Sequence, residues 1–152
     1  MFVRLIVFLF LNFGALAIGS IFTSKAVIGD WYLGLDKAPW TPPGWVFGAA
    51  WTTIMVCFSW YMAYAWATVR HQKLLLGLMV VQWILNVSWN PVFFTFHFIV
   101  LGLFVITALT IVVTYLFFRF YPELKMKSIL LLPYIIWLLI ATSLNAYVVI
   151  YN

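Results

Sequence analysis

The chain alternates long apolar stretches with short polar breaks. Five stretches offer the about 20 mostly apolar residues that a membrane-spanning helix requires. They are Phe2–Thr23, Gly44–Thr68, Leu74–Phe96, Phe98–Phe120 and Ser128–Ile150. The pattern predicts an all-α integral membrane protein, a bundle of five transmembrane helices formed by a single domain over residues 1–152.

The breaks between the stretches carry turn and proline signals. The third and fourth stretches are separated only by a tight turn near His97. Pro91 favours a kink or an early end of the third helix. Pro43 suits the first turn of the second helix, and the Tyr121-Pro122 step predicts the end of the fourth.

The first stretch has an alternative interpretation as a signal peptide. Arg4, the apolar run after it and Ala15-Leu16-Ala17 resemble such a peptide with a small-residue cleavage site. The apolar run nevertheless continues through Ile18–Phe22, which is longer than a signal peptide needs. We therefore favour a permanent first helix.

Composition excludes a water-soluble protein. Hydrophobic residues make up 67% of the chain and charged residues only 7%, whereas soluble domains carry about 25% charged residues. The net charge of +5 comes without a basic patch or a basic helix face, so we expect no nucleic-acid partner. The single cysteine, Cys57, cannot form an intrachain disulfide.

The charges between the stretches predict an orientation. With five helices, one face receives six of the eight basic residues, namely Arg4, Arg70, Lys73, Arg119, Lys125 and Lys127. The opposite face receives Lys25 and Lys37, offset by Asp30 and Asp36. The positive-inside rule then predicts a cytoplasmic N-terminus and an outside C-terminus, as in a bacterial inner membrane.

The segment Trp31–Phe47 is unusual for a connection between two membrane helices. It holds three of the nine tryptophans and three of the six prolines, although connections are usually small and polar. A stiff, aromatic connection suits the covering or gripping of a flat apolar ligand. By the charge rule it lies outside the cytoplasm.

Three amides form a polar stripe on the third stretch. Gln82, Asn86 and Asn90 are spaced four apart and therefore share one helix face. Such amides either tie helices together, at about 1 kcal/mol per bond, or anchor a ligand in an aromatic pocket. For Gln82 we favour the tie, and for Asn86 with Trp89 we favour the pocket.

The second and fifth stretches add candidate pocket residues. Trp137, Ala141 and Leu144 share a face with Asn145, and the small Ala141 leaves room beside the Trp137 ring. The alternatives are close helix packing at Ala141 and a lipid-facing Trp51. Counted at 1.5 Å per residue from the outer face, Trp51 lies about 10 Å deep and Asn86 about 15 Å deep. The residues therefore predict one outward-opening cavity.

The sequence contains no catalytic or metal-binding constellation. His71 and His97 are expected at opposite faces of the membrane and cannot share a metal. Asp30, Asp36 and Glu123 are too peripheral for a proton relay. We expect no metal and no cofactor.

These residues together resemble the TspO/MBR family of tryptophan-rich sensory proteins, which are related to the mitochondrial translocator protein. The resemblance runs from Gly14 to Asn145. It is carried by Trp31-Tyr32, Leu35, Lys37, Trp40-x-Pro42-Pro43-x-Trp45-Val46-Phe47, Ala50-Trp51-Thr52, Gln82, Asn86, Trp89-x-Pro91-x-Phe93-Phe94, Pro133-Tyr134, Trp137 and Ala141-Thr142-x-Leu144-Asn145. The order and spacing of these short motifs are specific as a set.

The resemblance implies a five-helix bundle, usually a homodimer, that binds tetrapyrroles such as protoporphyrin IX in an outward-facing pocket. It implies that Tyr32, Trp51, Asn86, Trp89, Trp137, Ala141 and Leu144 line this pocket and that Pro42 shapes its lid. Family members are described as carriers, as sensors or as agents of light- and oxygen-dependent porphyrin degradation, in which Trp51 and Trp137 would be the reacting indoles. Small-residue faces at Ala15-xxx-Gly19, Ala49-xxx-Thr53 and Ala63-xxx-Ala67 would allow a second copy to approach closely.

Two departures from the family pattern concern the connection and the end of the chain. A proline that often follows the connection lysine directly is moved one place here, to Lys37-Ala38-Pro39. The end Tyr147-Val-Val-Ile-Tyr151-Asn152 lacks the basic residue of the animal sterol pattern. Sterol binding at that end is therefore not expected.

Overall fold

The computed structural model describes all 152 residues and contains five long helices and no strand. The elements are α1 (Phe2–Ala26), α2 (Asp30–Leu33), α3 (Gly44–Thr68), α4 (Gln72–Asn90), the π-helical turn η1 (Pro91–Thr95), α5 (Ile99–Leu124), the 3₁₀ segment η2 (Lys125–Leu131) and α6 (Leu132–Tyr151). The helical stretches Phe2–Ala26, Gly44–Thr68, Gln72–Thr95 and Ile99–Tyr151 are long and apolar enough to cross a membrane, and the last contains both α5 and α6. The predicted all-α membrane bundle of five helices is confirmed.

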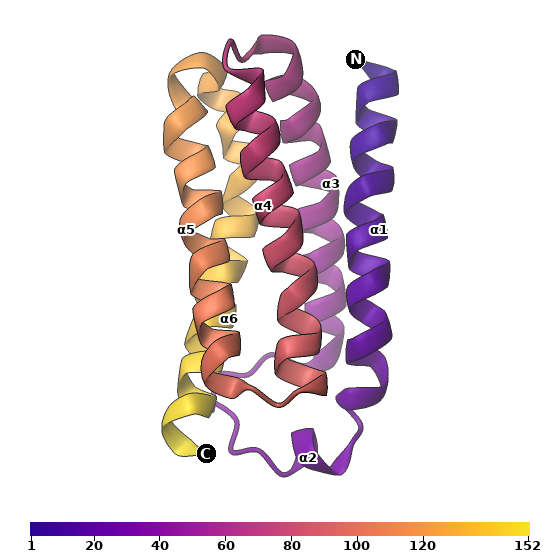
Figure 1. Ribbon diagram of the computed structural model, residues 1–152, viewed down its shortest axis with the longest axis vertical. Coiled ribbons are helices and arrows are strands. Elements are labelled where there is room, and N and C mark those ends of the chain that lie inside the picture. Colours follow the sequence, from indigo (N-terminus) through magenta and orange to yellow (C-terminus); the bar gives the residue numbers. More distant parts are fainter.

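The five long helices run alternately up and down in one elongated bundle (Figure 1). Helix α1 packs against α3 and α4, and α5 packs against α4 and α6. Helix α3 closes the ring through its contacts with η2 and α6. One end, here called the basic end, holds the N-terminus, the α3–α4 turn and η2. The other end, called the loop end, holds α2, the His97 turn and the C-terminus (Figure 1).

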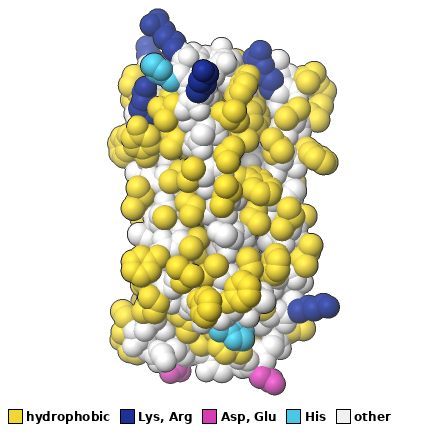
Figure 2. Space-filling model, viewed as in Figure 1, with side chains coloured by type: hydrophobic (Ala, Val, Ile, Leu, Met, Phe, Trp, Pro, Cys, Tyr) yellow, Lys and Arg dark blue, Asp and Glu magenta, His cyan; other side chains and the backbone are white.

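Charged side chains are segregated between these two ends. Figure 2 shows Lys and Arg mainly at the basic end and acidic side chains at the loop end, where a Lys or Arg side chain is also visible. At the basic end Glu123 of α5 holds the α3–α4 turn, because its Oε2 accepts the Arg70 backbone N–H at 2.9 Å, while its Oε1 lies 4.0 Å from Arg119 on the same helix. The six basic residues that the sequence assigns to one face therefore lie together at one end of the bundle.

The tightest packing lies towards the basic end. Phe58, Tyr61, Leu116, Phe120 and Leu131 are fully buried there. The Tyr61 hydroxyl donates to the Leu116 carbonyl at 3.2 Å, so its polar tip is satisfied within the apolar core. This end forms the rigid base of the bundle.

The two mid-stretch prolines behave differently. Helix α4 ends at Asn90, as Pro91 predicts, and the chain continues as η1 until His97, which takes φ 57° and ends the stretch. The predicted end of the fourth helix at Tyr121-Pro122 is wrong, because α5 continues to Leu124. A proline in the last turn removes a single backbone hydrogen bond, and the helix ends only where Lys125 adopts φ 49°.

Helix α1 is one continuous helix with a buried face. Asn12, Ala15 and Gly19 point into the bundle, and the Asn12 amide donates to the Ser59 hydroxyl of α3 at 2.8 Å. This packing favours a permanent helix over a cleaved signal peptide. Ala15, Gly19 and Ala63 are buried inside the bundle, whereas Ala49 and Thr53 are exposed.

Candidate functional site

The first half of the connection between α1 and α3, which includes α2, docks on η1. Trp31 stacks on His97 with ring centroids 3.9 Å apart and lies edge-on to Phe93 at 5.7 Å. Tyr32 packs against Phe94 at 5.6 Å. The left-handed backbone of His97 turns its ring towards the connection, so the aromatic segment is held against the end of the third membrane stretch.

The second half of the connection docks on α6. The Asp36 N–H donates to Oδ1 of Asn152 at 2.9 Å, and Nδ2 of Asn152 donates to the Asp36 carbonyl at 3.2 Å. Further along, the Trp40 indole donates to the Ser143 hydroxyl at 3.1 Å and lies edge-on to Tyr147. The connection, with the partly buried Pro42 near its end, therefore reaches from η1 across to α6.

These contacts show that the connection descends along α6 before α3 begins. Asn152 and Ser143 are nine residues apart, which is about 14 Å along a helix. The chain from Asp36 to Trp40 covers that length with three intervening residues and the Trp40 side chain. Helix α3 therefore starts well inside the bundle, and in Figure 1 the last turns of α6 extend past it. Trp51 therefore lies further from the loop end of the bundle than its position along α3 alone gives.

Burial changes the chemistry of Tyr32 at the edge of this connection. Desolvation raises the pKa of the Tyr32 phenol above its usual value, so the group is neutral at physiological pH. The Lys37 ammonium lies 4.7 Å from the centre of its ring, in the geometry of a cation–π contact. Tyr32 therefore offers a neutral hydroxyl on an aromatic surface.

Two hydrogen bonds cross the bundle from α4 to α6. Nearer the basic end, the Gln82 amide donates to the Tyr134 hydroxyl at 2.7 Å. Nearer the loop end, the Trp89 indole donates to Oδ1 of Asn145 at 3.2 Å. These two cross-links bound a layer of the bundle, which we call the central layer.

Most predicted pocket residues lie in or beside the central layer. Asn86 lies between the cross-links on α4, and Trp137, Ala141 and Leu144 lie between them on α6. Helix α3 joins from the side, since Trp51 is edge-on to Tyr134 at 6.0 Å and Phe47 is edge-on to Trp137 at 5.2 Å. Tyr32 and Pro42 lie apart from the layer, in the connection at the loop end.

Asn86 differs from the other two amides of the stripe in its hydrogen bonding. Its side chain is only 7% exposed and makes no hydrogen bond to any protein group. Its neighbours on the stripe both take part in side-chain hydrogen bonds, Gln82 to Tyr134 and Asn90 with the Thr23 hydroxyl at 2.8 Å, although Oε1 of Gln82 is buried without a partner. A nearly buried amide without a partner costs free energy unless it meets another polar group, so Asn86 is available to a ligand.

Several residues that build this region were not among the sequence candidates. Tyr134 and Phe47 pack against the two predicted tryptophans, and each lies three or four residues from Trp137 or Trp51 on the same helix face. This three- or four-residue spacing could have identified Tyr134 and Phe47 from the sequence. Gly102 was not detectable, because its role is to let α5 approach Phe93 and Asn145, which lie within 3.3 Å of where its Cβ would be.

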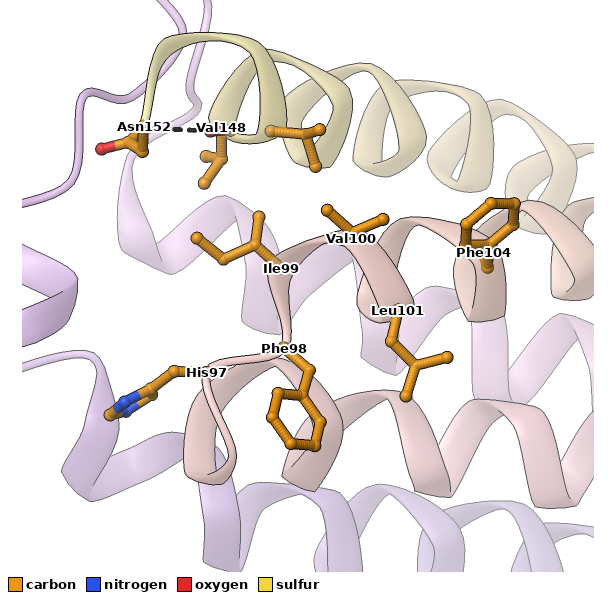
Figure 3. A pocket seen from close by; sticks show the side chains of 9 residues that line it. His97, Phe98, Ile99, Val100, Leu101, Phe104, Val148 and Asn152 are labelled. Carbon is orange, nitrogen blue, oxygen red and sulfur yellow. Dashed lines mark hydrogen bonds between the residues drawn. The ribbon is translucent and has the colours of Figure 1, made fainter.

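Two surface grooves adjoin the region. One, of about 600 Å³, lies between the first turns of α5 and the last turns of α6, and Figure 3 shows Val100, Leu101 and Phe104 along it, with His97 at one end. The other, of about 360 Å³, lies between α3 and α6 and includes Trp137 in its lining. No three His, Cys, Asp or Glu side chains lie close enough together to hold a metal ion.

A bundle of this kind, with an aromatic connection over one end, defines a helical membrane protein. The family model described as "TspO/MBR family" matches residues 6–151. The chain belongs to the TspO/MBR family.

Individual relatives support the same assignment. The chain is 35% identical over 135 residues to the tryptophan-rich protein TspO of Archaeoglobus fulgidus, covering 88% of this chain and 87% of that protein. It is 33% identical to the protein CrtK of Rhodobacter capsulatus, over 85% of this chain and 80% of the relative. It is 29% identical to the human translocator protein, again over 85% and 80%.

Proposed function

We propose that the protein is a membrane receptor or carrier that binds porphyrin-like tetrapyrroles, such as protoporphyrin IX, with a sensory, regulatory or transport role. The observation that carries the proposal is the nearly buried Asn86 side chain, which forms no hydrogen bond and lies in the same layer as Trp137. The names of relatives, a tryptophan-rich sensory protein of Cereibacter sphaeroides and the human translocator protein, are compatible with such a role.

The proposed site follows the chemistry of a flat apolar ligand. Such ligands bind between apolar and aromatic surfaces, with a few polar groups that fix orientation. Trp51 and Trp137 would supply ring surfaces, and the Asn86 amide would bond a polar atom of the ligand. Trp89, Ala141 and Leu144 would complete the lining, while Tyr32 and Pro42 would belong to the cover.

Replacing both tryptophans by phenylalanine tests this assignment. We expect Trp51→Phe with Trp137→Phe to weaken protoporphyrin binding about tenfold, since each aromatic contact contributes about 0.5–1.5 kcal/mol beyond its area. Titration of porphyrin fluorescence in lipid nanodiscs measures this. The control is Trp60→Phe, which removes an indole from α3 where it stacks on Tyr64 towards the basic end. Equal affinity in all three proteins would refute the roles of Trp51 and Trp137.

A second candidate function is light- and oxygen-dependent degradation of the porphyrin. The observation that favours it is that Trp51 and Trp137, two oxidisable indoles, lie at the same α3–α6 contact. Illumination of the same samples in air distinguishes the two functions. A new absorbing product that requires the protein and both indoles would indicate degradation, whereas reversible quenching alone would indicate binding.

We further propose that the basic end faces the cytoplasm and that the protein forms a homodimer in the bilayer. Six basic residues at one end against two at the other support this orientation. We expect a compartment-sensitive reporter to be active on the cytoplasmic side when fused to the N-terminus, and on the outside when fused to the C-terminus. The reverse pattern would overturn the orientation without affecting the ligand site.

A further inference from the structure

The groove between α3 and α6 opens on the membrane-facing perimeter of the bundle. From α3 it is lined by the small residues Ala49, Ala50 and Thr53 between Val46 and Ile54, and from α6 by Pro133, Ile136, Trp137 and Ile140. Because α3 begins well inside the bundle, the groove lies at the level of the apolar bilayer core. Small side chains on one wall leave the space that a larger residue would fill.

The lining of the groove selects an apolar occupant. The Thr53 hydroxyl is already bonded to the Ala49 carbonyl at 2.9 Å, so it has no free hydrogen to offer. Backbone donors in the middle of both helices are used within the helices themselves. Such a wall offers a ligand no free hydrogen-bond donor, so it suits contact with the apolar edge of a macrocycle.

Trp137 separates this groove from the central layer. Its side chain is only 6% exposed, yet it belongs to the groove lining on one side. On the other side it lies on the helix face of Ala141, between the two cross-links from α4. Trp137 therefore belongs both to the groove lining and to the central layer that contains Asn86.

The loop end offers a more obstructed route. A ligand entering there must displace the connection, which is held by the Trp31–His97 stack, by the Trp40–Ser143 hydrogen bond and by the paired bonds of Asp36 with Asn152. We propose that tetrapyrroles pass sideways between the bilayer core and the central layer, through the groove between α3 and α6. This inference rests on the proposed function, because it concerns the route to that site.

A second copy of the chain is a poorer occupant of the groove than the ligand. A helix with its side chains is about 10 Å wide, and a groove of about 360 Å³ admits an edge of a flat molecule rather than a helix. That volume is near the lower limit of small-molecule sites, which span about 300–1,000 Å³. Passage of a whole macrocycle therefore requires α3 and α6 to separate slightly.

Neighbouring threonines provide a matched test. Thr53 lines the groove, whereas Thr52 is exposed outside it, and both hydroxyls bond the carbonyl four residues earlier, at 2.9 and 2.8 Å. In stopped-flow measurements with protoporphyrin in vesicles, we expect Thr53→Phe to slow association and dissociation together by about tenfold, within the range seen among variants of one site. Thr52→Phe should behave as wild type, and Ala49→Phe provides a second obstruction if Thr53→Phe does not fold.

The outcomes separate the route from the site. Unchanged association in both groove variants would overturn the route. A faster dissociation with unchanged association would also overturn it, because the groove would then be part of the binding surface. A changed oligomeric state with unchanged association would assign the groove to a second copy instead.

A measurement without porphyrin tests the opening of the groove separately from the proposed function. In vesicles of acyl-chain-brominated phosphatidylcholine, Trp137 should be quenched by lipid chains, which is measured as the difference between wild type and Trp137→Phe. Thr53→Phe should abolish this difference and Thr52→Phe should retain it. Failure of wild type to bind porphyrin would refute the proposed function, whereas an unquenched Trp137 would refute the groove as an opening to the bilayer.

Discussion

Replacement of Asn86 by leucine is expected to weaken porphyrin binding about thirtyfold while leaving the stability of the ligand-free protein unchanged. In the free protein the Asn86 side chain bonds no protein group, so its removal breaks no contact. In the complex, a ligand polar atom would lose its partner, which costs about 2 kcal/mol. Porphyrin titration and thermal unfolding in detergent measure the two effects separately.

The same substitution at Asn12 supplies the control. Asn12 is also nearly buried, at 4% exposure, but its amide is bonded to Ser59 between α1 and α3. Asn12→Leu should therefore lower stability by about 1 kcal/mol and leave porphyrin affinity unchanged. If Asn86→Leu instead destabilised the free protein while binding porphyrin normally, Asn86 would be an interhelical tie, like its neighbour Gln82.

The course of the five membrane helices could be predicted from the sequence because hydropathy and length act locally. Each stretch must be long enough to span the bilayer and apolar enough to remain there, and both properties are visible in a window of residues. The predicted stretch Gly44–Thr68 coincides with α3. Pro122 was misjudged because the cost of a proline depends on its distance from the helix end, which the sequence alone did not fix.

The depth of the candidate site could not be predicted because it depends on contacts distant in sequence. The position of Trp51 depends on where α3 begins, and that point is set by Asp36 bonding Asn152 and Trp40 bonding Ser143. These pairs are 116 and 103 residues apart. The residue types of the site were visible from spacing, but their convergence on one layer required the tertiary structure.

The distinction between a bonded and an unbonded amide also lay beyond the sequence. Gln82, Asn86 and Asn90 are equivalent by spacing, yet their partners come from different helices, namely Tyr134 on α6 for Gln82 and Thr23 on α1 for Asn90. The preference for Gln82 as a tie agrees with its bond to Tyr134. Which amide is left for a ligand is decided by the arrangement of the other helices around α4.

The largest effect on stability is expected from Gly19→Leu. A Cβ at position 19 would lie 2.7 Å from Nδ2 of Asn90, so even a methyl group forces that amide to move. The amide is held by the Thr23 hydroxyl at 2.8 Å and by the Asn86 carbonyl at 3.2 Å. Overpacking costs about 1–3 kcal/mol and a lost intramembrane hydrogen bond about 1 kcal/mol. We therefore expect a loss of about 3 kcal/mol in unfolding free energy.

Gly14→Leu is the matched control, because nothing lies within 4 Å of a Cβ built at that position on the same helix. It should be neutral or slightly stabilising, since leucine favours a helix over glycine by about 0.5–1 kcal/mol. Asn90→Ala should restore part of the stability of Gly19→Leu, because it removes the group that the new side chain strikes. Such non-additivity is the expected signature of two residues in direct contact. Equal stability of the Gly14 and Gly19 variants would show that α1 does not approach α4 at Asn90, and the amide stripe would then lack its support from the first helix.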